Sequence, residues 1–485
     1  MIELDHLEQY KENNRIEAKK ALGGLPHSIW ETYSAFANTL GGIILLGVEE
    51  YRDKTLHTVN LPDPEKLVRE FWAIVNDRSK TSANILSSKD VTIENIKGDH
   101  IIVINVPRAQ RDFKPVYVDG SPLNAYRRGG EGDYKCTKEE YQAMVRDSAV
   151  QTQDMTILNE MTADVFSKES VYAYRRLLSI SGTDNTRDHL DDEDLLFRLG
   201  AAGIGRDGQI HPTAAGLLMF GRESDIIREY PNYFLDYREE SGNNHRITYR
   251  FLSASGEWSG NIFDFYTHVY DKLNHDPQLL PEKSDEFNSD YKAVLKAVRE
   301  ALANCLINAD YCGCGGITVI RQHDKLTFTN PGDFRIEASA AMNGGFSDPR
   351  NSIIMKMFNL IDVCEGTGNG IPNIFYVWKN LGLKEPKITP IYEPNRIELS
   401  LPLTKTDDNT GALTDRIKKS NGKSAIQKAM IVEYLTDHAD ASVAELSGLL
   451  DVKASRVKQL IYELTDENIV SPQGKSKNRR YKLKS

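Results

Sequence analysis

The sequence predicts an α/β protein that is divided into several domains. At 485 residues, the chain is long enough for two to four domains that each bury a core. Hydrophobic residues make up 40% and charged residues 27%, which are ordinary values for a soluble protein. Short apolar strands alternate with helical patterns in residues 1–150 and again in 281–404, as they do in mixed α/β domains.

Three features predict a cytoplasmic protein that does not enter a membrane. The chain has no run of eighteen apolar residues, its acidic N-terminus lacks a signal-peptide pattern, and its five cysteines are few and unevenly spaced. The net charge of −10 argues against a uniformly basic surface that is coated with nucleic acid. A local basic patch remains compatible with this charge.

One helical stripe carries the chemistry that matters most. Glu300, Asn304 and Asn308 recur every four residues, so a helix over 299–310 would place them on one face. The residues between them are apolar and would face a core. Carboxylate and amide oxygens on one stripe suit a metal ion and an activated water. The alternative is a solvated surface stripe.

Two predicted strands and a series of glycine loops follow this helix. The strands cover 315–320 and 325–330, and glycines then recur in 344–351 and 365–371. A further helix is predicted over 371–381. Because glycine lets backbone amides approach an anion, and a helix start adds free N–H groups, the ordered set favours phosphate binding.

Residues 281–404 resemble a divergent branch of the GHKL ATPases, the group that includes DNA gyrase and the histidine kinases. The resemblance implies an α/β sandwich that binds ATP and Mg²⁺. It implies that Glu300 is the general base and that Asn304 is the Mg²⁺ ligand, with Asn308 nearby. The resemblance further assigns an adenine-side loop and a phosphate loop, whose residues are Asn330, Gly332, Gly366, Gly368 and Gly370.

The chain departs from this family at two places. The adenine-side loop usually carries Asp, whereas this chain has Asn330. The branch commonly has His-Arg-Asp at the end of the helix, whereas this chain has Asn308-Ala309-Asp310. The first departure still predicts nucleotide binding. The second leaves open whether ATP is hydrolysed or only held.

Residues 1–150 form the first predicted unit. Helices are expected over 25–39 and 137–146, the second capped by Thr137 with Glu140 three residues later. The expected strands cover 43–48, 100–107, 115–120 and 125–129.

This unit resembles the Schlafen AlbA-2 domain. The resemblance rests on Ile16-Glu17-Ala18-Lys19, on the Ala-Asn-Thr-x-Gly-Gly core at 37–42, on Pro115 and on Tyr126-Arg127-Arg128-Gly129. It implies contact with DNA or RNA. One branch of this family cuts RNA with three carboxylates and a divalent metal ion.

Three acids are candidates for such a nuclease site. Glu12 and Glu17 stand five apart, as in the nuclease branch, and the third acid would be Glu50 or, as the second choice, Glu49. A five-residue gap brings two side chains together only if Asn13-Asn14 turns the backbone. Three acids could then hold Mg²⁺ or Mn²⁺ and activate a water. The alternative is a set of solvated charges beside neighbouring lysines.

The rest of the chain divides into three predicted parts. Residues 151–280 are expected to be an α/β connector whose aromatic residues form core, and 405–423 a linker. Residues 424–485 predict three helices and a β-hairpin, a winged helix-turn-helix, in which Ser442 with Glu445 three residues later caps the second helix. The cations expected to contact nucleic acid, here and in the first unit, are Lys19, Arg127, Arg128, Lys453, Arg456, Lys458, Lys477, Arg479 and Arg480.

Two functions remain open from the sequence. The first is an ATP-gated, metal-dependent nuclease, with RNA as one candidate substrate, in a homo-oligomer with a role in bacterial phage defence or stress. The second is a non-catalytic transcriptional regulator that responds to ATP and binds DNA. Helicase activity is disfavoured because the chain has no Gly-x-x-x-x-Gly-Lys-Ser/Thr loop.

Overall fold

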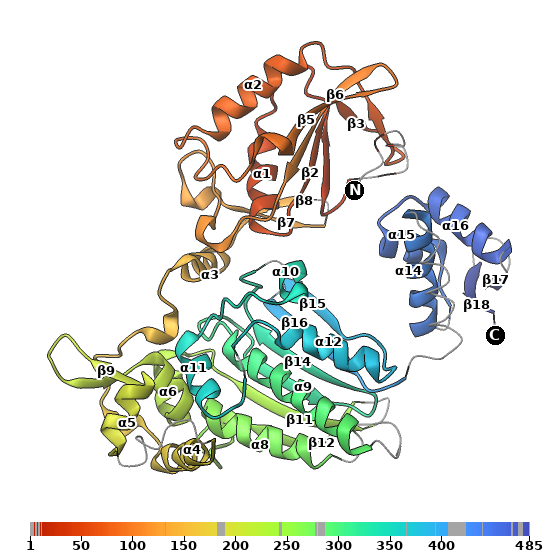
Figure 1. The fold of residues 1–485 in the computed structure, drawn as a ribbon. Coiled ribbons are helices and arrows are strands. Elements are labelled where there is room, and N and C mark those ends of the chain that lie inside the picture. Colours follow the sequence, from red (N-terminus) through yellow and green to blue (C-terminus); the bar gives the residue numbers. More distant parts are fainter. Residues whose placement is uncertain are drawn as a thin grey trace. The chain divides into compact units, whose positions relative to one another are not determined.

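The chain folds into two compact units, which are described separately. Unit 1 comprises Met1–Ala109, Phe113–Tyr141 and Thr406–Ser485, and unit 2 comprises Gln110–Asp112 and Gln142–Lys405. The computed structural model, drawn in Figure 1, describes every residue except 1–3, 5–6, 8–9, 11, 131, 182–189, 242–244, 277–278, 280–286, 337, 365, 393, 406–422, 439, 467–468, 474–478 and 485.

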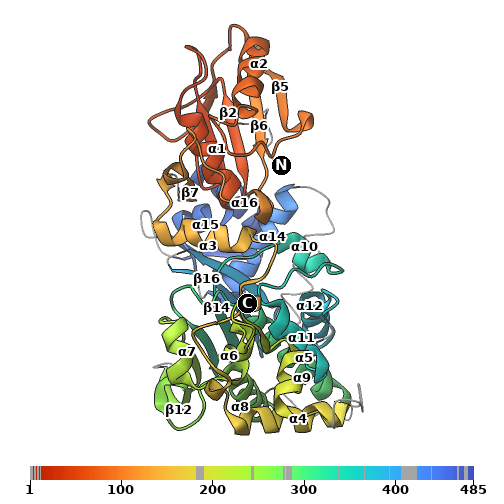
Figure 2. The ribbon, with the colours of Figure 1, turned by 90° about the vertical axis from the view of Figure 1, so that its left-hand side faces the viewer.

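The N-terminal part of unit 1 is built around a four-stranded sheet of order β1-β2-β6-β5. One face packs against α1 and α2, which Figure 2 shows beside the sheet, and the other face packs against the segment before β1 and a small hairpin. The elements are β1 (Ile16–Lys19), α1 (Ser28–Asn38), β2 (Gly42–Leu46), β3 (Val48–Glu50), β4 (Leu56–Thr58), α2 (Pro64–Val75), β5 (Val91–Ile96), β6 (Asp99–Val106), β7 (Tyr126–Gly129), β8 (Gly132–Lys135) and α3 (Lys138–Ser148), of which the residues from Gln142 onward belong to unit 2.

Unit 2 begins with helices and a small two-stranded sheet. These elements share one continuous core with the larger sheet that follows them. They are α4 (Lys168–Ser181), α5 (Asp192–Leu199), β9 (Ala202–Ile204), β10 (Ile210–Pro212), α6 (Ala214–Phe220) and α7 (Glu223–Glu229).

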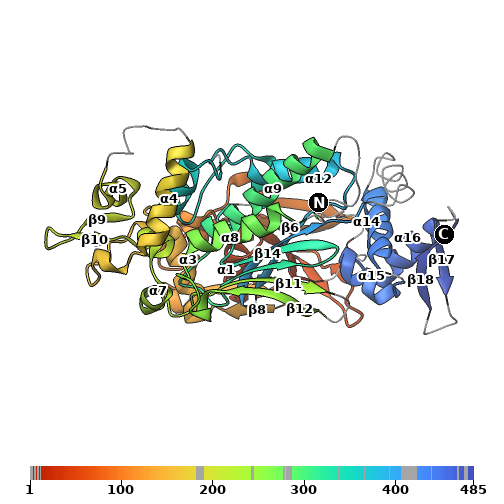
Figure 3. The ribbon, with the colours of Figure 1, turned by 90° about the horizontal axis from the view of Figure 1, so that it is seen from below.

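The centre of unit 2 is a six-stranded sheet of order β12-β11-β13-β14-β16-β15. Figure 3 shows α8, α9 and α12 as a layer on one face of this sheet. Its elements are β11 (Leu235–Ser241), β12 (Arg246–Leu252), α8 (Ile262–Asn274), α9 (Phe287–Ile307), β13 (Ile317–Arg321), β14 (Lys325–Pro331), α10 (Ala338–Asn343), α11 (Ser352–Leu360), α12 (Gly370–Asn380), β15 (Lys387–Tyr392) and β16 (Asn395–Pro402).

The C-terminal residues form three helices and a hairpin with a core of their own. The N-terminus of α15 has the predicted capping box, in which Ser442 and Glu445 satisfy each other's backbone N–H groups. The elements are α14 (Lys423–Asp437), α15 (Val443–Leu450), α16 (Ala454–Asp466), β17 (Val470–Gln473) and β18 (Arg480–Leu483).

Most predicted elements are present, with three differences. The strand expected over 115–120 is wrong, because Tyr117 and Val118 each form only an isolated bridge. Helix α9 ends at Ile307 rather than at Asp310, because the Asp310 N–H donates to the carbonyl of Pro331. The large sheet also reaches into the expected connector, since β11 pairs in parallel with β13.

Candidate functional site

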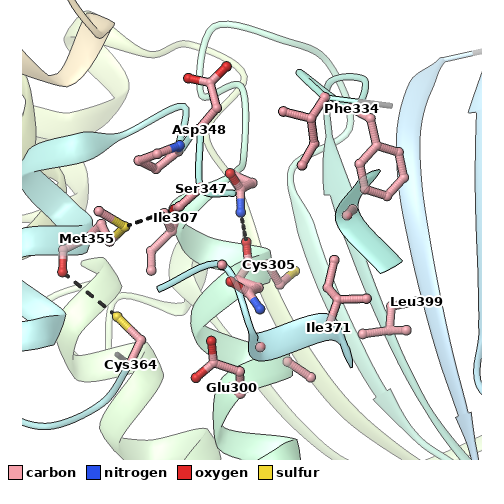
Figure 4. A pocket seen from close by; sticks show the side chains of 18 of the residues that line it. Glu300, Cys305, Ile307, Phe334, Ser347, Asp348, Met355, Cys364, Ile371 and Leu399 are labelled. Carbon is pink, nitrogen blue, oxygen red and sulfur yellow. Dashed lines mark hydrogen bonds between the residues drawn. The ribbon is translucent and has the colours of Figure 1, made fainter. Parts of the chain in front are cut away.

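A cavity of about 290 Å³ lies in unit 2 between α9, the strands of the sheet and two glycine-containing loops. Figure 4 shows it from close by, with Asp348 and Glu300 at opposite ends of the view. The predicted residues that line it are Glu300, Asn304, Asn308, Asn330, Gly366, Gly368 and Gly370. The predicted polar stripe of α9 and the predicted glycine-containing loops therefore meet at one cavity.

The polar stripe of α9 forms one wall of the cavity. The Asn308 side chain binds the last turn of the helix, since its amide nitrogen donates to the backbone carbonyl of Asn304 at 3.1 Å. Its oxygen accepts from the Arg350 N–H at 3.4 Å. The Asn304 side chain makes no hydrogen bond to the described residues and borders the cavity, so its amide oxygen is available to a ligand.

Glu300 lies against the start of α12. A Cβ atom at Gly370, the first residue of that helix, would overlap the Glu300 carboxylate. A side chain at position 370 would therefore displace the carboxylate, which sits at the positive end of the helix. Burial first, and the charge of Glu300 second, raise the pKa of the Cys364 thiol to about 12, so this thiol is uncharged at neutral pH.

The two glycine-containing loops hold each other in place. Gly368 has a φ of +77°, and a Cβ atom there would overlap the carbonyl oxygen of Phe346. The Asn369 side-chain oxygen accepts from the Gly345 N–H at 3.2 Å. Three glycines, Gly366, Gly368 and Gly370, line this end of the cavity, and positions without a side chain let backbone N–H groups approach phosphate oxygens.

The sheet supplies an apolar floor. Phe328, Ile388, Ile397 and Leu399 come from β14, β15 and β16. Asn330 ends the floor, 8% exposed. Gly332 does not line the cavity, because the Arg350 guanidinium packs over it. A flat apolar surface beside a polar wall can receive an aromatic ring that carries a charged group.

Arginines that the sequence analysis did not single out shape the rim. Arg350 grips Asp147 with two hydrogen bonds, each of 2.7 Å. Burial is the largest single effect and would raise the pKa of Asp147. The charge and hydrogen bonds of Arg350, together with the charges of Arg335 and Arg146, outweigh burial and hold that pKa below its usual value. Arg335 pairs with Asp348 at 3.2 Å. The sequence predicts only a glycine-containing loop over 344–351, because Asp147, the partner of Arg350, is 203 residues away in the chain.

The three acids of unit 1 are each engaged with other groups. Glu12 accepts from the Ala18 N–H at 3.0 Å, across the predicted turn in which the Arg15 N–H donates to Asn13. Burial first, and then Glu17 and Glu50, raise the pKa of Glu12, which shows that the acids lie near one another.

The other two acids of this group are paired with cations. Glu17 pairs with Lys19 and with Arg128, both at 2.9 Å. Glu50 pairs with Lys54 at 3.0 Å. Within the described part of the chain, no set of three His, Cys, Asp or Glu side chains is arranged to hold a metal ion.

Family models match three stretches of the chain. Residues 12–137 match "Schlafen, AlbA_2", and residues 315–399 match the family described as "Putative ATP-dependent DNA helicase recG C-terminal". The chain carries a Schlafen AlbA_2 domain and an ATPase-like domain. Between them, residues 142–236 match a domain of unknown function, DUF8451.

The chain is also similar to solved structures. The DIP2311 protein of Corynebacterium diphtheriae is 16% identical, with 97% of this chain and 95% of that chain covered and a TM-score of 0.41. The N-terminal domain of a RecG-related protein, a putative ATP-dependent DNA helicase of Nitrosomonas europaea, is 33% identical over 28% of this chain and 92% of that one, with a TM-score of 0.22. No curated protein matches the chain.

The cations predicted in the AlbA_2 domain serve its fold. Arg128 is only 4% exposed and binds Glu17 and Asp133, so it is not free to contact nucleic acid, contrary to the prediction. Arg127 pairs with Glu140 at 2.7 Å, and Lys19 pairs with Glu17. The partners of Arg127 and Arg128 come from other elements, so those pairings could not be seen in the sequence.

The C-terminal cations divide into paired and exposed ones. Arg480 pairs with Asp440 and Glu445, and Arg456 bonds to Gln427 and Gln459. Lys453 is half-buried, whereas Lys458 and Arg479 are exposed. Lys477 lies outside the described residues.

No described helix has both the length and the apolar character that crossing a bilayer requires.

Proposed function

We propose that this protein binds nucleic acid in a manner controlled by ATP, which occupies the cavity of the ATPase-like domain together with Mg²⁺. The observation that carries the proposal is the convergence of Glu300, the uncommitted Asn304 and the loop before α12 on one cavity with an apolar floor. Bound ATP would supply a base for the floor, phosphates for the backbone amides and a γ-phosphate as an electrophile.

The residues of the cavity then have distinct tasks. The Asn304 oxygen is a hard ligand that suits Mg²⁺. Glu300 is held near the start of α12, where a carboxylate can orient a water and accept its proton. The charged side chains of the lining balance, with Lys296, Arg335 and Arg350 against Glu300, Asp333 and Asp348, so a metal ion would be needed to bind a polyanion well.

The decisive experiment is calorimetry of ATP and ADP binding in Mg²⁺ buffer, combined with a phosphate-release assay. We expect Asn304→Ala to weaken Mg²⁺-dependent binding at least tenfold, roughly the loss of one charge-assisted contact. Glu300→Gln should retain binding and lose turnover. Asn380→Ala, which alters an exposed asparagine at the end of α12, is the matched control. Absence of ATP binding by the wild-type protein would refute the proposal.

The nucleic-acid side of the proposal rests on the AlbA_2 domain and on the C-terminal helices. The order of three helices and a hairpin is that of a winged helix, and Lys458 on α16 with Arg479 beside β18 supplies exposed cations. Cycles of ATP binding would act through a homo-oligomer, and phage defence or stress control is the setting that we propose. Helicase activity is not part of it, because the chain has no Gly-x-x-x-x-Gly-Lys-Ser/Thr loop.

A metal-dependent nuclease is the second candidate. The observation in its favour is that Glu50 keeps one buried oxygen without a hydrogen bond among the described residues, near Glu12 and Glu17. Incubation of labelled RNA and DNA with Mg²⁺ or Mn²⁺, with and without ATP, tests it. Cleavage that Glu17→Gln abolishes would support it. Binding without cleavage would favour a DNA-binding transcriptional regulator instead.

A further inference from the structure

The hairpin of β3 and β4 in the AlbA_2 domain presents an aromatic pair at the surface. The ring of Tyr51, directly after β3, stacks on the imidazole of His57 in β4, with centroids 4.0 Å apart and planes inclined by 24°. Tyr51 is nevertheless 49% exposed. One face of the ring is therefore covered by His57, and much of the remaining surface is open to solvent.

Hydrogen bonds within the hairpin fix the position of this pair. The Tyr51 N–H donates to the carbonyl of Thr55 at 2.8 Å, and the Lys54 N–H donates to the carbonyl of Tyr51 at 2.9 Å. The Thr55 hydroxyl lies 2.6 Å from Nε2 of His57 and 2.6 Å from the Asp53 carboxylate. Both rings thus belong to one short closed turn, so a ligand would find them already ordered.

Charges around the pair are balanced. Arg52 and Asp53, both exposed, follow Tyr51 in the chain and carry opposite charges. The two acids that precede Tyr51 are each neutralised, Glu49 by Lys20 at 2.5 Å and Glu50 by Lys54 at 3.0 Å. The surroundings of the aromatic surface therefore carry no net negative charge, which would repel phosphates.

We propose that Tyr51, supported by His57, is a stacking platform for an unpaired base, so that the AlbA_2 domain takes single-stranded nucleic acid. The inference rests on the proposed nucleic-acid binding and adds its substrate class. In a duplex each base face is covered by its neighbours, whereas an unpaired base can lie on an exposed aromatic ring. Such stacking tolerates any base, so the platform selects strand state rather than sequence.

A control residue lies in the same domain. Tyr134 in β8 is 56% exposed, which is comparable to Tyr51. Within the described residues it stacks on no aromatic ring. Loss of Tyr134 removes a similar area of surface without removing a stacked pair.

The test is fluorescence anisotropy of the full chain with labelled 12-nucleotide RNA and DNA, single-stranded and as duplexes, in the presence of ATP and Mg²⁺, with each probe checked on a gel to be intact after the measurement. We expect Tyr51→Ala to weaken binding of single strands by about 5- to 150-fold, the usual effect of removing one stacking ring. Duplex binding should change by less than about twofold. Tyr51→Phe should behave like the wild type, and Tyr51→Leu like Tyr51→Ala, because only the π-face matters.

Three outcomes are distinguishable. If the wild-type protein binds none of the four probes, the proposed function itself fails. If it binds them and Tyr51→Ala stays within twofold on single strands, the stacking platform is refuted. Equal losses on single strands and duplexes, or equal losses from Tyr51→Ala and Tyr134→Ala, would also refute it.

Discussion

The cavity of unit 2 and the acidic group of unit 1 both contain polar side chains that could bind a ligand. They differ in whether other groups of the protein already bind those side chains. In the cavity, the Asn304 amide makes no hydrogen bond to the described residues, and Glu300 faces the start of a helix. In unit 1, Glu12, Glu17 and Glu50 are each held by a backbone N–H or by a cation.

This difference distinguishes a candidate ligand-binding site from charged side chains that stabilise the fold. A polar group that faces a cavity without a partner loses little when a ligand binds it, whereas a paired carboxylate must first give up its ion pair. The cavity is therefore better prepared for a ligand than the acidic group. Four substitutions break or sharpen this contrast, and they follow from the largest expected effect to the smallest.

Asp147→Asn tests whether unit 2 also contains acids that serve only the fold. It leaves the buried Arg350 without its two-pronged partner, so we expect a loss of about 3–5 kcal/mol of unfolding free energy at pH 7. Because the pKa of Asp147 is lower in the folded state, its contribution exists above about pH 4 and is lost as the pH falls through that pKa. Denaturant unfolding at pH 7 and pH 3.5 measures the difference in unfolding free energy between variant and wild type, which should be smaller at pH 3.5. A difference that does not change with pH would contradict the stabilising role of the ionised Asp147.

Gly370→Ala tests whether the position of Glu300 matters to the ligand. The added methyl group would overlap the carboxylate, and overpacking of this kind costs about 1–3 kcal/mol. We expect nucleotide affinity to fall about 10- to 100-fold in calorimetry. Gly448→Ala, in α15, meets no atom within 4 Å and is the control. Unchanged nucleotide affinity in Gly370→Ala would show that the position of Glu300 does not affect nucleotide binding.

Glu12→Gln probes the acidic group of unit 1. Its carboxyl has a raised pKa, mainly through burial and further through Glu17 and Glu50, so the ionised form destabilises the fold as the pH rises through that pKa. We expect the variant to be more stable than the wild type at pH 7, by less than about 1 kcal/mol, and equally stable near pH 3.5. Melting temperatures at both pH values decide the sign. A less stable variant at pH 7 would mean that Glu12 is stabilised by its neighbours.

Lys54→Ala should have the smallest effect. The Lys54–Glu50 pair is exposed on the lysine side, so its loss should change unfolding free energy by less than about 0.5 kcal/mol. Chemical denaturation measures this. A loss above about 1 kcal/mol would show that Glu50 is more tightly bound to the fold than the comparison implies.

Local chemistry predicted many of the elements. The capping residues Thr137 with Glu140 and Ser442 with Glu445 form the expected reciprocal bonds, because these contacts span only three residues. The stripe of Glu300, Asn304 and Asn308 faces a single cavity because helical spacing imposes it. The aromatic residues predicted to be core, such as Tyr237 and Phe265, are buried.

Long-range pairing decided the rest. The sequence could not show that Arg128 is buried against Glu17 and Asp133, since its partner Glu17 is 111 residues away. It could not show that Arg350 is held by Asp147, or that β11 joins the large sheet beside β13. Such partners are set by the folding of distant segments together and leave no periodic signal.

The amino-acid order alone determined the helical stripe, the glycine-containing loops, the helix caps and the broad α/β character, because each depends on backbone geometry over a few residues. Only the tertiary structure decided which charged groups remain available. A polar group is available to a ligand only if no distant side chain binds it in the fold. In this protein Arg128, 111 residues away, binds Glu17, whereas Asn304 has no side-chain hydrogen bond among the described residues.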